Sequence, residues 1–290
     1  MHKSRVTLLI RAIIFMLIGG VSIALMQAAV KLLSSDLHPF LITLYRAALV
    51  FIVLLPILLW KGFAAVKTSS VKLQVARGAV GGIGMLCVFT GLSLVSLAEA
   101  TALLFTVPIF ATLLSVIFLA EKVGVRRWAA ILVGFAGIII ITRPETSLNL
   151  GHLFLICAAI SWSTSILIAK KLTEKDTILS ITFWQAMGCV PLAFAASLFV
   201  WALPTSEQLL YLLGIASLGT LGHALLYASL KIGKVSVILP LDYIRIIWSA
   251  MLGFLLFNHL PTAHMYAGSL LIICATAFIS YRELRKPRIA

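Results

Sequence analysis

The sequence predicts an all-α polytopic membrane protein with ten transmembrane helices arranged as two inverted five-helix repeats. Three observations support this fold class: the composition, an internal repeat and the one-sided placement of basic residues. Of the 290 residues, 62% are hydrophobic and 11% are charged, whereas soluble proteins contain about 25% charged residues. The mean hydropathy of +1.13 also indicates a chain that is largely embedded in lipid.

Ten apolar segments have the length of membrane spans, since a bilayer is crossed by roughly 20 helical residues. In chain order we expect spans over residues 12–33, 39–59, 74–94, 97–119, 127–142, 151–170, 178–202, 208–229, 235–257 and 263–281. The first apolar run exceeds the roughly 7–15 residues of a signal peptide, so we interpret it as an uncleaved helix. The connections are brief and leave no room for a soluble domain.

Basic residues follow the predicted topology closely. Of the 23 Lys and Arg residues, all but four fall at span ends or in connections on one side of the membrane, Arg77 among them. The other side holds Lys31 and Arg143, and Arg46 and Arg245 lie inside spans. Because cytoplasmic loops are enriched in Lys and Arg, we expect both termini in the cytoplasm. The net charge of +14 then reflects topology, and we expect no nucleic-acid partner.

The two halves of the chain repeat each other. Ile42–Ala47 is echoed by Ile181–Ala186, and Trp128–Leu132 by Tyr266–Leu270. Each half contains five spans, so the second copy enters the membrane in the opposite orientation, as in many secondary transporters. We therefore predict a first repeat over residues 1–145 and a second repeat over residues 146–290.

The ninth span contains the most informative polar residues. Asp242 and Arg245 stand three residues apart, so they share a helix face and can pair. Pro240 precedes them and removes a backbone donor, which predicts a kink or local opening. Charges inside a span are costly unless they are paired or face a cavity. Asp242 either binds a substrate group or a proton, or forms a structural ion pair with Arg245.

Several segments resemble a known family. Pro39–Ala47 and Phe118–Lys122, within two five-span halves, resemble the drug/metabolite transporter superfamily, and the EamA type in particular. This resemblance implies a monomeric, cofactor-free transporter of the inner (plasma) membrane. Leu241–Arg245 together with Gly253–Phe257 is similar to the branch that contains riboflavin and S-adenosylmethionine carriers. The sequence departs from the family at Asn258, where a glutamate is usual.

Arg46 and His223 are the other ionisable residues that lie deep in spans. Arg46 either captures a carboxylate or phosphate, or forms a fixed pair with Glu99, and we favour the pair. His223 either couples transport to protons or is a buried histidine that a neighbouring hydroxyl satisfies. It shares a helix face with Tyr227, four residues further on.

Aromatic and amide side chains also lie deep within the predicted spans, away from the interfacial positions that Trp and Tyr prefer. This set comprises Gln27, Trp162, Trp184, Gln185, Tyr227, Tyr243 and Trp248. Each aromatic alone is explained by packing against helices or lipid. Together they favour an aromatic or heterocyclic substrate, since flat molecules are held by stacking and a few hydrogen bonds.

The remaining motifs narrow the function. The four cysteines, Cys87, Cys157, Cys189 and Cys274, show no ligand spacing, so we expect no metal site and no cofactor. We expect a secondary transporter for a small organic metabolite, with riboflavin, S-adenosylmethionine and amino acids as candidates. A broad-specificity metabolite or drug exporter is the alternative. An integral membrane enzyme or a channel is a further alternative, although no catalytic cluster and no repeated polar face supports either.

Overall fold

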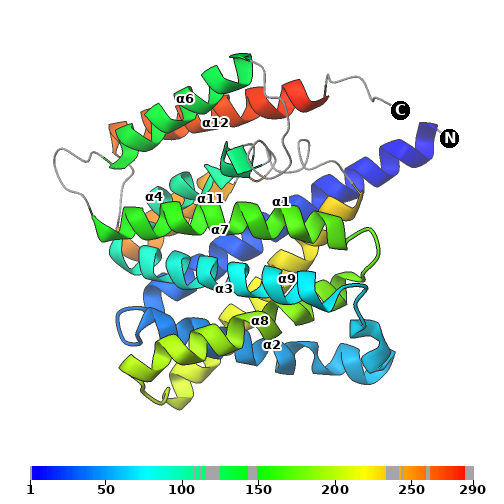
Figure 1. The fold of residues 1–290 in the computed structure, drawn as a ribbon. Helices are drawn as coiled ribbons and strands as arrows, with labels where there is room; N and C mark the ends of the chain where they lie inside the picture. The colour runs from blue at the N-terminus through cyan, green and yellow to red at the C-terminus, as the bar shows by residue number, and fades with distance from the viewer. Residues whose placement is uncertain are drawn as a thin grey trace.

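The computed structural model describes residues 2–107, 109–111, 113–114, 125–142, 149–232, 242, 245–258 and 262–284. The regular structure of these residues is helical throughout (Figure 1). The α-helices are α1 (His2–Leu33), α2 (Pro39–Lys61), α3 (Val71–Leu94), α4 (Leu97–Leu104), α6 (Val125–Thr142), α7 (Leu150–Leu172), α8 (Ile178–Ser197), α9 (Ser206–Ile232), α11 (Arg245–Phe257) and α12 (Ala263–Leu284). Two short 3-10 helices, η1 (Phe63–Val66) and η2 (Leu198–Val200), follow α2 and α8.

Within the described part of the chain, six helices are long and apolar enough to cross a membrane, and four apolar helices are shorter. The shorter ones are Leu97–Ala111, Trp128–Ile141, Arg245–Phe257 and Ala263–Ala275. Each coincides with a predicted span, so the predicted all-α membrane fold is confirmed. The predicted ninth span differs in one respect: α11 begins at Arg245, so Asp242 precedes the helix, and Pro240 lies outside the described residues.

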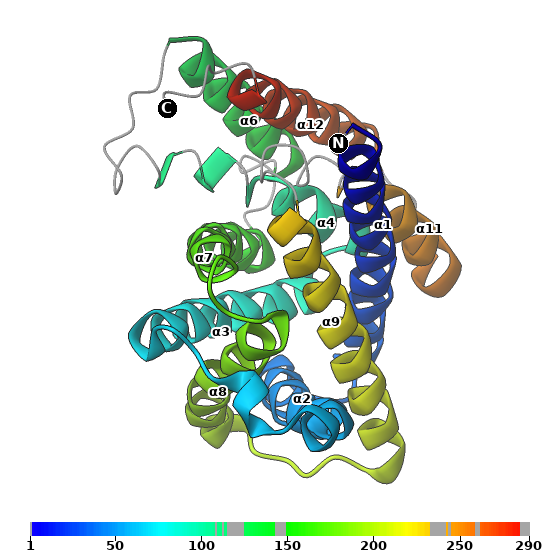
Figure 2. The same ribbon diagram turned by 90° about the vertical axis from the view of Figure 1, so that its right-hand side faces the viewer.

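The helices of one half pack against those of the other in a symmetric pattern (Figures 1 and 2). Helix α1 packs on α9, and α3 packs on α7 in the equivalent contact of the other half. When each helix is replaced by its equivalent in the other half, the α2–α9 contact becomes the α3–α8 contact. The α1–α11 contact becomes the α4–α7 contact in the same way. Three contacts join equivalent helices to each other: α2 to α8, α4 to α11, and α6 to α12. The two halves are therefore interleaved and do not form separate bodies.

Glycines allow the interleaved helices to approach closely. A Cβ added at Gly78 of α3 would lie 2.8 Å from the Cα of Gly188 in α8. A Cβ added at Gly19 of α1 would lie 3.2 Å from the carbonyl oxygen of Gly222 in α9. Small residues at such crossings let membrane helices gain van der Waals contact without a hydrophobic driving force.

The bundle has two ends, which we name by a residue at each. The Glu99 end holds the connection over residues 34–38, the α3–α4 junction and the start of α7. The Asp176 end holds the connections over residues 62–70 and 173–177 and the start of α1. Figure 1 shows that α1 begins and α12 ends on this same side of the bundle. A chain that crosses the bundle an even number of times begins and ends on the same side.

Candidate functional site

A cavity lies in the middle of the bundle, between helices of both halves. Its walls come from α1, α2, α3, α4, α7, α8, α9 and α11, with Asp242 just before α11. About 1120 Å³ of space lies between the lining atoms, counting any part open to the surroundings. Seven of the predicted site residues line it: Arg46, Trp162, Gln185, His223, Tyr227, Asp242 and Arg245.

The cavity lies closer to the Asp176 end than to the Glu99 end on three of its helices. Its lining positions on α7 run from Trp162 to Ile166, in a helix that finishes at the Asp176 end. Those on α8 run from Thr182 to Ala186, and those on α9 from Thr220 to Tyr227. Helix α8 starts and α9 finishes at this same end.

Arg46 is buried in the cavity wall, with an exposed fraction of 4%. Its Nη1 lies 3.0 Å from the Sδ of Met85, and its Nη2 lies 3.4 Å from the Nδ1 of His223. Gly219 makes room for the guanidinium, because a Cβ there would lie 2.8 Å from Nη2. The predicted pair with Glu99 is wrong, since Glu99 binds a different partner at the end of the bundle.

One wall of the cavity is aromatic. The rings of Trp162 on α7 and His223 on α9 meet edge to face, with centroids 6.1 Å apart. Tyr227 follows one turn later, its centroid 6.3 Å from that of His223, as the shared helix face predicts. The Nδ1 of His223 lies 2.7 Å from the carbonyl oxygen of Gly219, so this nitrogen carries the hydrogen. The 3.4 Å approach of Arg46 to the same nitrogen therefore adds no hydrogen bond.

Arg77 contacts Tyr227 of this wall but does not itself line the cavity. It is the main residue that the sequence interpretation missed. Its side chain is fully buried in α3. Its Nη1 donates to the carbonyl oxygen of Ile181 at 2.8 Å, and its Nη2 donates to the hydroxyl of Tyr227 at 2.6 Å. By sequence alone, Arg77 is grouped with the basic residues at span ends and in connections. Its position inside the predicted third span was the signal that it is buried.

Asp242 and Arg245 form the predicted ion pair at the start of α11. The Oδ2 of Asp242 accepts from the Nη2 of Arg245 at 2.8 Å and from its Nε at 3.2 Å. The carboxylate precedes the helix and so faces its positive N-terminal end. Gln27 of α1 also contacts Arg245, through Oε1 at 3.2 Å, although it does not line the cavity. The Oδ1 of Asp242 has no hydrogen-bond partner among the described residues.

Gln185 occupies the position in the second half that Arg46 occupies in the first, as the echo of Ile42–Ala47 in Ile181–Ala186 predicts. Both side chains line the cavity. Each also packs on a glycine, Gly219 for Arg46 and Gly81 for Gln185. The repeat thus places one guanidinium and one amide at equivalent points of the wall.

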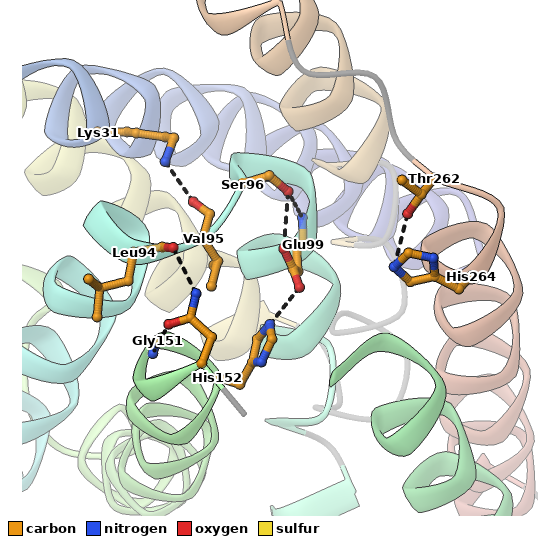
Figure 3. Close-up of polar contacts among 10 residues, drawn as sticks. Lys31, Leu94, Val95, Ser96, Glu99, Gly151, His152, Thr262 and His264 are labelled. Carbon is orange, nitrogen blue, oxygen red and sulfur yellow. Dashed lines mark hydrogen bonds and ion pairs between the residues drawn. The ribbon is translucent and has the colours of Figure 1, made fainter. Parts of the chain in front are cut away.

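Glu99 lies outside the cavity and closes the Glu99 end (Figure 3). Its carboxylate pairs with the Nε2 of His152 at 2.5 Å, which joins α4 to α7. Beside it, Lys31 of α1 donates to the carbonyl oxygen of Val95 at 2.6 Å. Asn149 donates to the carbonyl oxygen of Leu94 at 3.1 Å. These contacts tie α1 and α7 to the α3–α4 junction.

At the Asp176 end, one carboxylate joins two connections. Asp176 accepts hydrogen bonds from the Oγ1 of Thr68 at 2.5 Å, the backbone N–H of Ser69 at 2.8 Å and the Nε2 of Gln74 at 2.9 Å. Burial alone would raise the pKa of Asp176, but these hydrogen bonds outweigh it and lower the pKa below its usual value. Thr177 reinforces the contact by donating to the carbonyl oxygen of Ala65 at 2.8 Å.

Three further predicted site residues do not line the described cavity. Trp184 faces the Asp176 end, where its Nε1 donates to the carbonyl oxygen of Val66 at 3.0 Å. Trp248 is half-buried on α11. Tyr243 lies outside the described residues. The assembled cavity therefore offers guanidinium groups, one carboxylate, one imidazole, one amide and aromatic faces, a set suited to holding a flat polar molecule.

The chain is similar to known transporters over most of its length. The model of the EamA-like transporter family matches it twice, over residues 10–143 and 149–281. An S-adenosylmethionine uptake transporter of Rickettsia prowazekii (strain Madrid E) is 30% identical over 275 residues, which cover 94% of each chain. A riboflavin transporter of Vibrio cholerae serotype O1 is 27% identical over 281 residues, covering 95% of this chain and 94% of that one. A solved crystal structure with 19% identity and a TM-score of 0.63 covers 94% of this chain and 99% of its own, which shows a shared fold.

Proposed function

This chain belongs to the EamA-like transporter family, and from that premise we propose that it is an inner-membrane secondary transporter of a small organic metabolite. The observation that carries the proposal is the polar cavity at the interface of the two halves. Substrate sites of inverted-repeat transporters lie at such an interface, near the middle of the membrane. Each half contributes cavity-lining helices here: α1, α2, α3 and α4 from the first, and α7, α8, α9 and α11 from the second.

We propose that the two halves rock about this cavity and expose it to each side of the membrane in turn. The Glu99–His152 pair, with Lys31 and Asn149 beside it, would hold the Glu99 end shut in the present conformation. The cavity lies nearer the Asp176 end on α7, α8 and α9, which supports access from that side. For opening at the Glu99 end, the contact between α4 and α7 has to break.

We further propose that the Asp176 end faces the cytoplasm, with both termini on that side and the repeats meeting at residues 145 and 146. The support is the distribution of Lys and Arg, which places most of the basic residues of the connections at this end. Under this orientation the cavity of the present conformation lies towards the cytoplasm. We propose a monomer as the functional unit, because one chain supplies both halves of the cavity.

For the substrate, we propose S-adenosylmethionine or riboflavin as the first candidates, with amino acids next. Relatives that share nearly the full length of the chain carry the names of transporters for the first two. Both molecules contain a flat heterocycle, which fits the wall formed by Trp162, His223 and Tyr227. We propose no catalytic step, since binding and release are sufficient for transport.

Uptake by purified protein in proteoliposomes tests this function. We expect saturable uptake of radiolabelled S-adenosylmethionine or riboflavin, and faster uptake when the vesicles are preloaded with the same unlabelled compound. Preloading accelerates a carrier that alternates between two sides but leaves a channel unaffected. Empty vesicles are the control. Uptake that is unsaturable and insensitive to preloading would contradict the proposal, and uptake of many unrelated compounds would favour a broad exporter.

A further inference from the structure

We infer that the substrate carries a carboxylate or phosphate and that Arg46 is the residue that binds it. The inference deepens the proposed transport function and rests on it, because it concerns the same cavity. It selects one substrate class: flat molecules with an anionic group, in preference to neutral ones. It begins from the finding that Arg46 does not pair with Glu99.

Arg46 has no anionic partner among the described residues. Glu99 pairs with His152, and Asp242 pairs with Arg245, so both of these carboxylates are already engaged. The other acidic side chains that the structure describes, Asp36, Glu174, Asp176 and Glu207, lie at the ends of the bundle. Arg46 is nonetheless buried, with an exposed fraction of 4%, and it faces the cavity.

The protein contacts of Arg46 are weak for a buried guanidinium. Its Nη1 meets a thioether sulfur, which is a poor acceptor, and its Nε has no partner. The Nδ1 of His223 carries its hydrogen towards Gly219 and cannot accept from Nη2. A buried cation without a counter-ion is unfavourable unless something outside the protein neutralises it. An anionic ligand group in the cavity supplies that neutralisation and accepts from the planar fork of the guanidinium.

The neighbourhood of Arg46 fits an anion that is attached to a ring. Thr220 lies beside Gly219 on α9 and lines the cavity, and its buried hydroxyl has no partner. The hydroxyl is therefore free to donate to the same anionic group. The edge-to-face rings of Trp162 and His223 continue the wall from this point. A molecule with its anion at Arg46 places its flat part against these rings.

Arg77 provides the contrast, because it is a buried arginine with a structural role. Its two terminal nitrogens donate to the carbonyl oxygen of Ile181 at 2.8 Å and to the hydroxyl of Tyr227 at 2.6 Å. It also packs over the Tyr227 ring at 4.9 Å. Removing Arg77 breaks internal contacts, whereas removing Arg46 chiefly removes an uncompensated charge.

The stability of the ligand-free protein tests this difference without any substrate. We expect Arg46→Met to raise the apparent melting temperature of the purified full chain, since it removes an uncompensated buried charge. We expect Arg77→Met to lower it, because internal hydrogen bonds are lost. Lys171→Met, at an exposed position of α7, is the control and should leave it unchanged. A loss of stability in Arg46→Met as large as that in Arg77→Met would overturn the inference.

Two matched ligand pairs test the anion directly. The probes are S-adenosylmethionine with its decarboxylated form, and riboflavin 5′-phosphate with riboflavin. We expect wild-type protein to bind the anionic member of at least one pair about tenfold more tightly, and Arg46→Gln to lose most of that preference. Lys171→Gln should retain it. Equal binding within both pairs, or an unchanged preference in Arg46→Gln, would overturn the inference while leaving transport intact.

If wild-type protein binds none of the four probes, S-adenosylmethionine and riboflavin are excluded as substrates, and the stability comparison between Arg46→Met and Arg77→Met then tests the anion site. Failure of the proposed function and failure of the inference therefore give different results. The first removes uptake altogether, and the second leaves uptake that does not discriminate between charged and neutral substrates.

Discussion

At the scale of single residues, the cavity separates two kinds of buried charge. Arg245 is compensated, because Asp242 contacts it through two nitrogens and Gln27 through a third. Arg46 is not compensated by any described carboxylate. The Oδ1 of Asp242 remains unpartnered at the cavity, so this carboxylate can serve Arg245 and a ligand at once. A transporter that alternately binds and releases a polar molecule is expected to use such side chains, whose hydrogen-bonding capacity is not fully satisfied within the protein.

Asp242→Asn is expected to reduce transport at least about tenfold, because it weakens the pair with Arg245 and removes the charge that a ligand would meet. The measurement is uptake in proteoliposomes, with size-exclusion chromatography to confirm that the variant is folded. Glu174→Gln, at an exposed position, is the matched control and should transport like the wild type. Wild-type uptake in a folded Asp242→Asn protein would remove this carboxylate from the mechanism.

At the scale of the elements, short connections fix the ends of the helices. Asp176 lies between α7 and α8, yet its hydrogen bonds go to Thr68, Ser69 and Gln74 at the start of α3. This carboxylate therefore links the two halves at the Asp176 end. The Glu99–His152 pair links α4 to α7 at the other end. At each end, an acidic side chain therefore joins a helix or connection of the first half to one of the second.

The stability contributed by Asp176 is expected to depend on pH in a defined direction. The pKa of Asp176 in the folded protein lies below its ordinary value, so the ionised form stabilises the fold. This contribution is complete above the unfolded pKa of about 3.9 and is lost as the pH falls through the lower folded value. We expect Asp176→Asn to be less stable by about 2 kcal/mol at pH 7, with the difference shrinking only below about pH 4.

Thermal unfolding of detergent-purified protein across this pH range measures the effect. Asp36→Asn is the control, since Asp36 is exposed in the corresponding connection of the first half and should change stability little. A difference between wild type and Asp176→Asn that disappears near neutral pH would show that the hydrogen bonds do not favour the ionised form.

At the scale of the whole molecule, the interleaved packing of the halves explains how one chain builds a cavity with two exits. Among the described helices, each major contact between the halves has a symmetric counterpart or joins two equivalent helices. Close crossings such as Gly78 with Gly188 place the backbones against each other without large side chains between them. Two nearly equivalent halves can exchange the roles of open and closed end, which is the basis of the proposed rocking motion.

The proposed orientation predicts which connections are accessible from outside the cell. In a variant with the four native cysteines replaced by alanine, we expect Ser35→Cys to react with a membrane-impermeant maleimide in intact cells. Lys67→Cys is expected to react only after the membrane is permeabilised, because it lies in the cytoplasmic connection. The cysteine-free parent controls for background labelling. The reverse pattern would invert the topology and move the cavity to the opposite face.

The sequence alone determined the spans, the helical class and the correspondence between the halves. These depend on hydropathy and on repeated segments, which are local properties of the chain. It also predicted that Asp242 and Arg245 can pair, because residues three apart in the chain remain close even though Asp242 precedes the helix. The clustering of Arg46, Gln185, His223 and Tyr227 at one cavity agrees with the expectation that deep polar residues face the interior.

Only the tertiary structure decided which distant groups meet. Glu99 binds His152, which is 53 residues away, and Arg77 binds Tyr227 across 150 residues. Such partners depend on where two helices cross and how each is rotated, and hydropathy contains no information on either. Arg46 and Glu99 match in charge and in predicted depth, yet Arg46 contacts Met85 and His223 while Glu99 pairs with His152. The unpaired guanidinium that this leaves at the cavity is therefore a property of the fold.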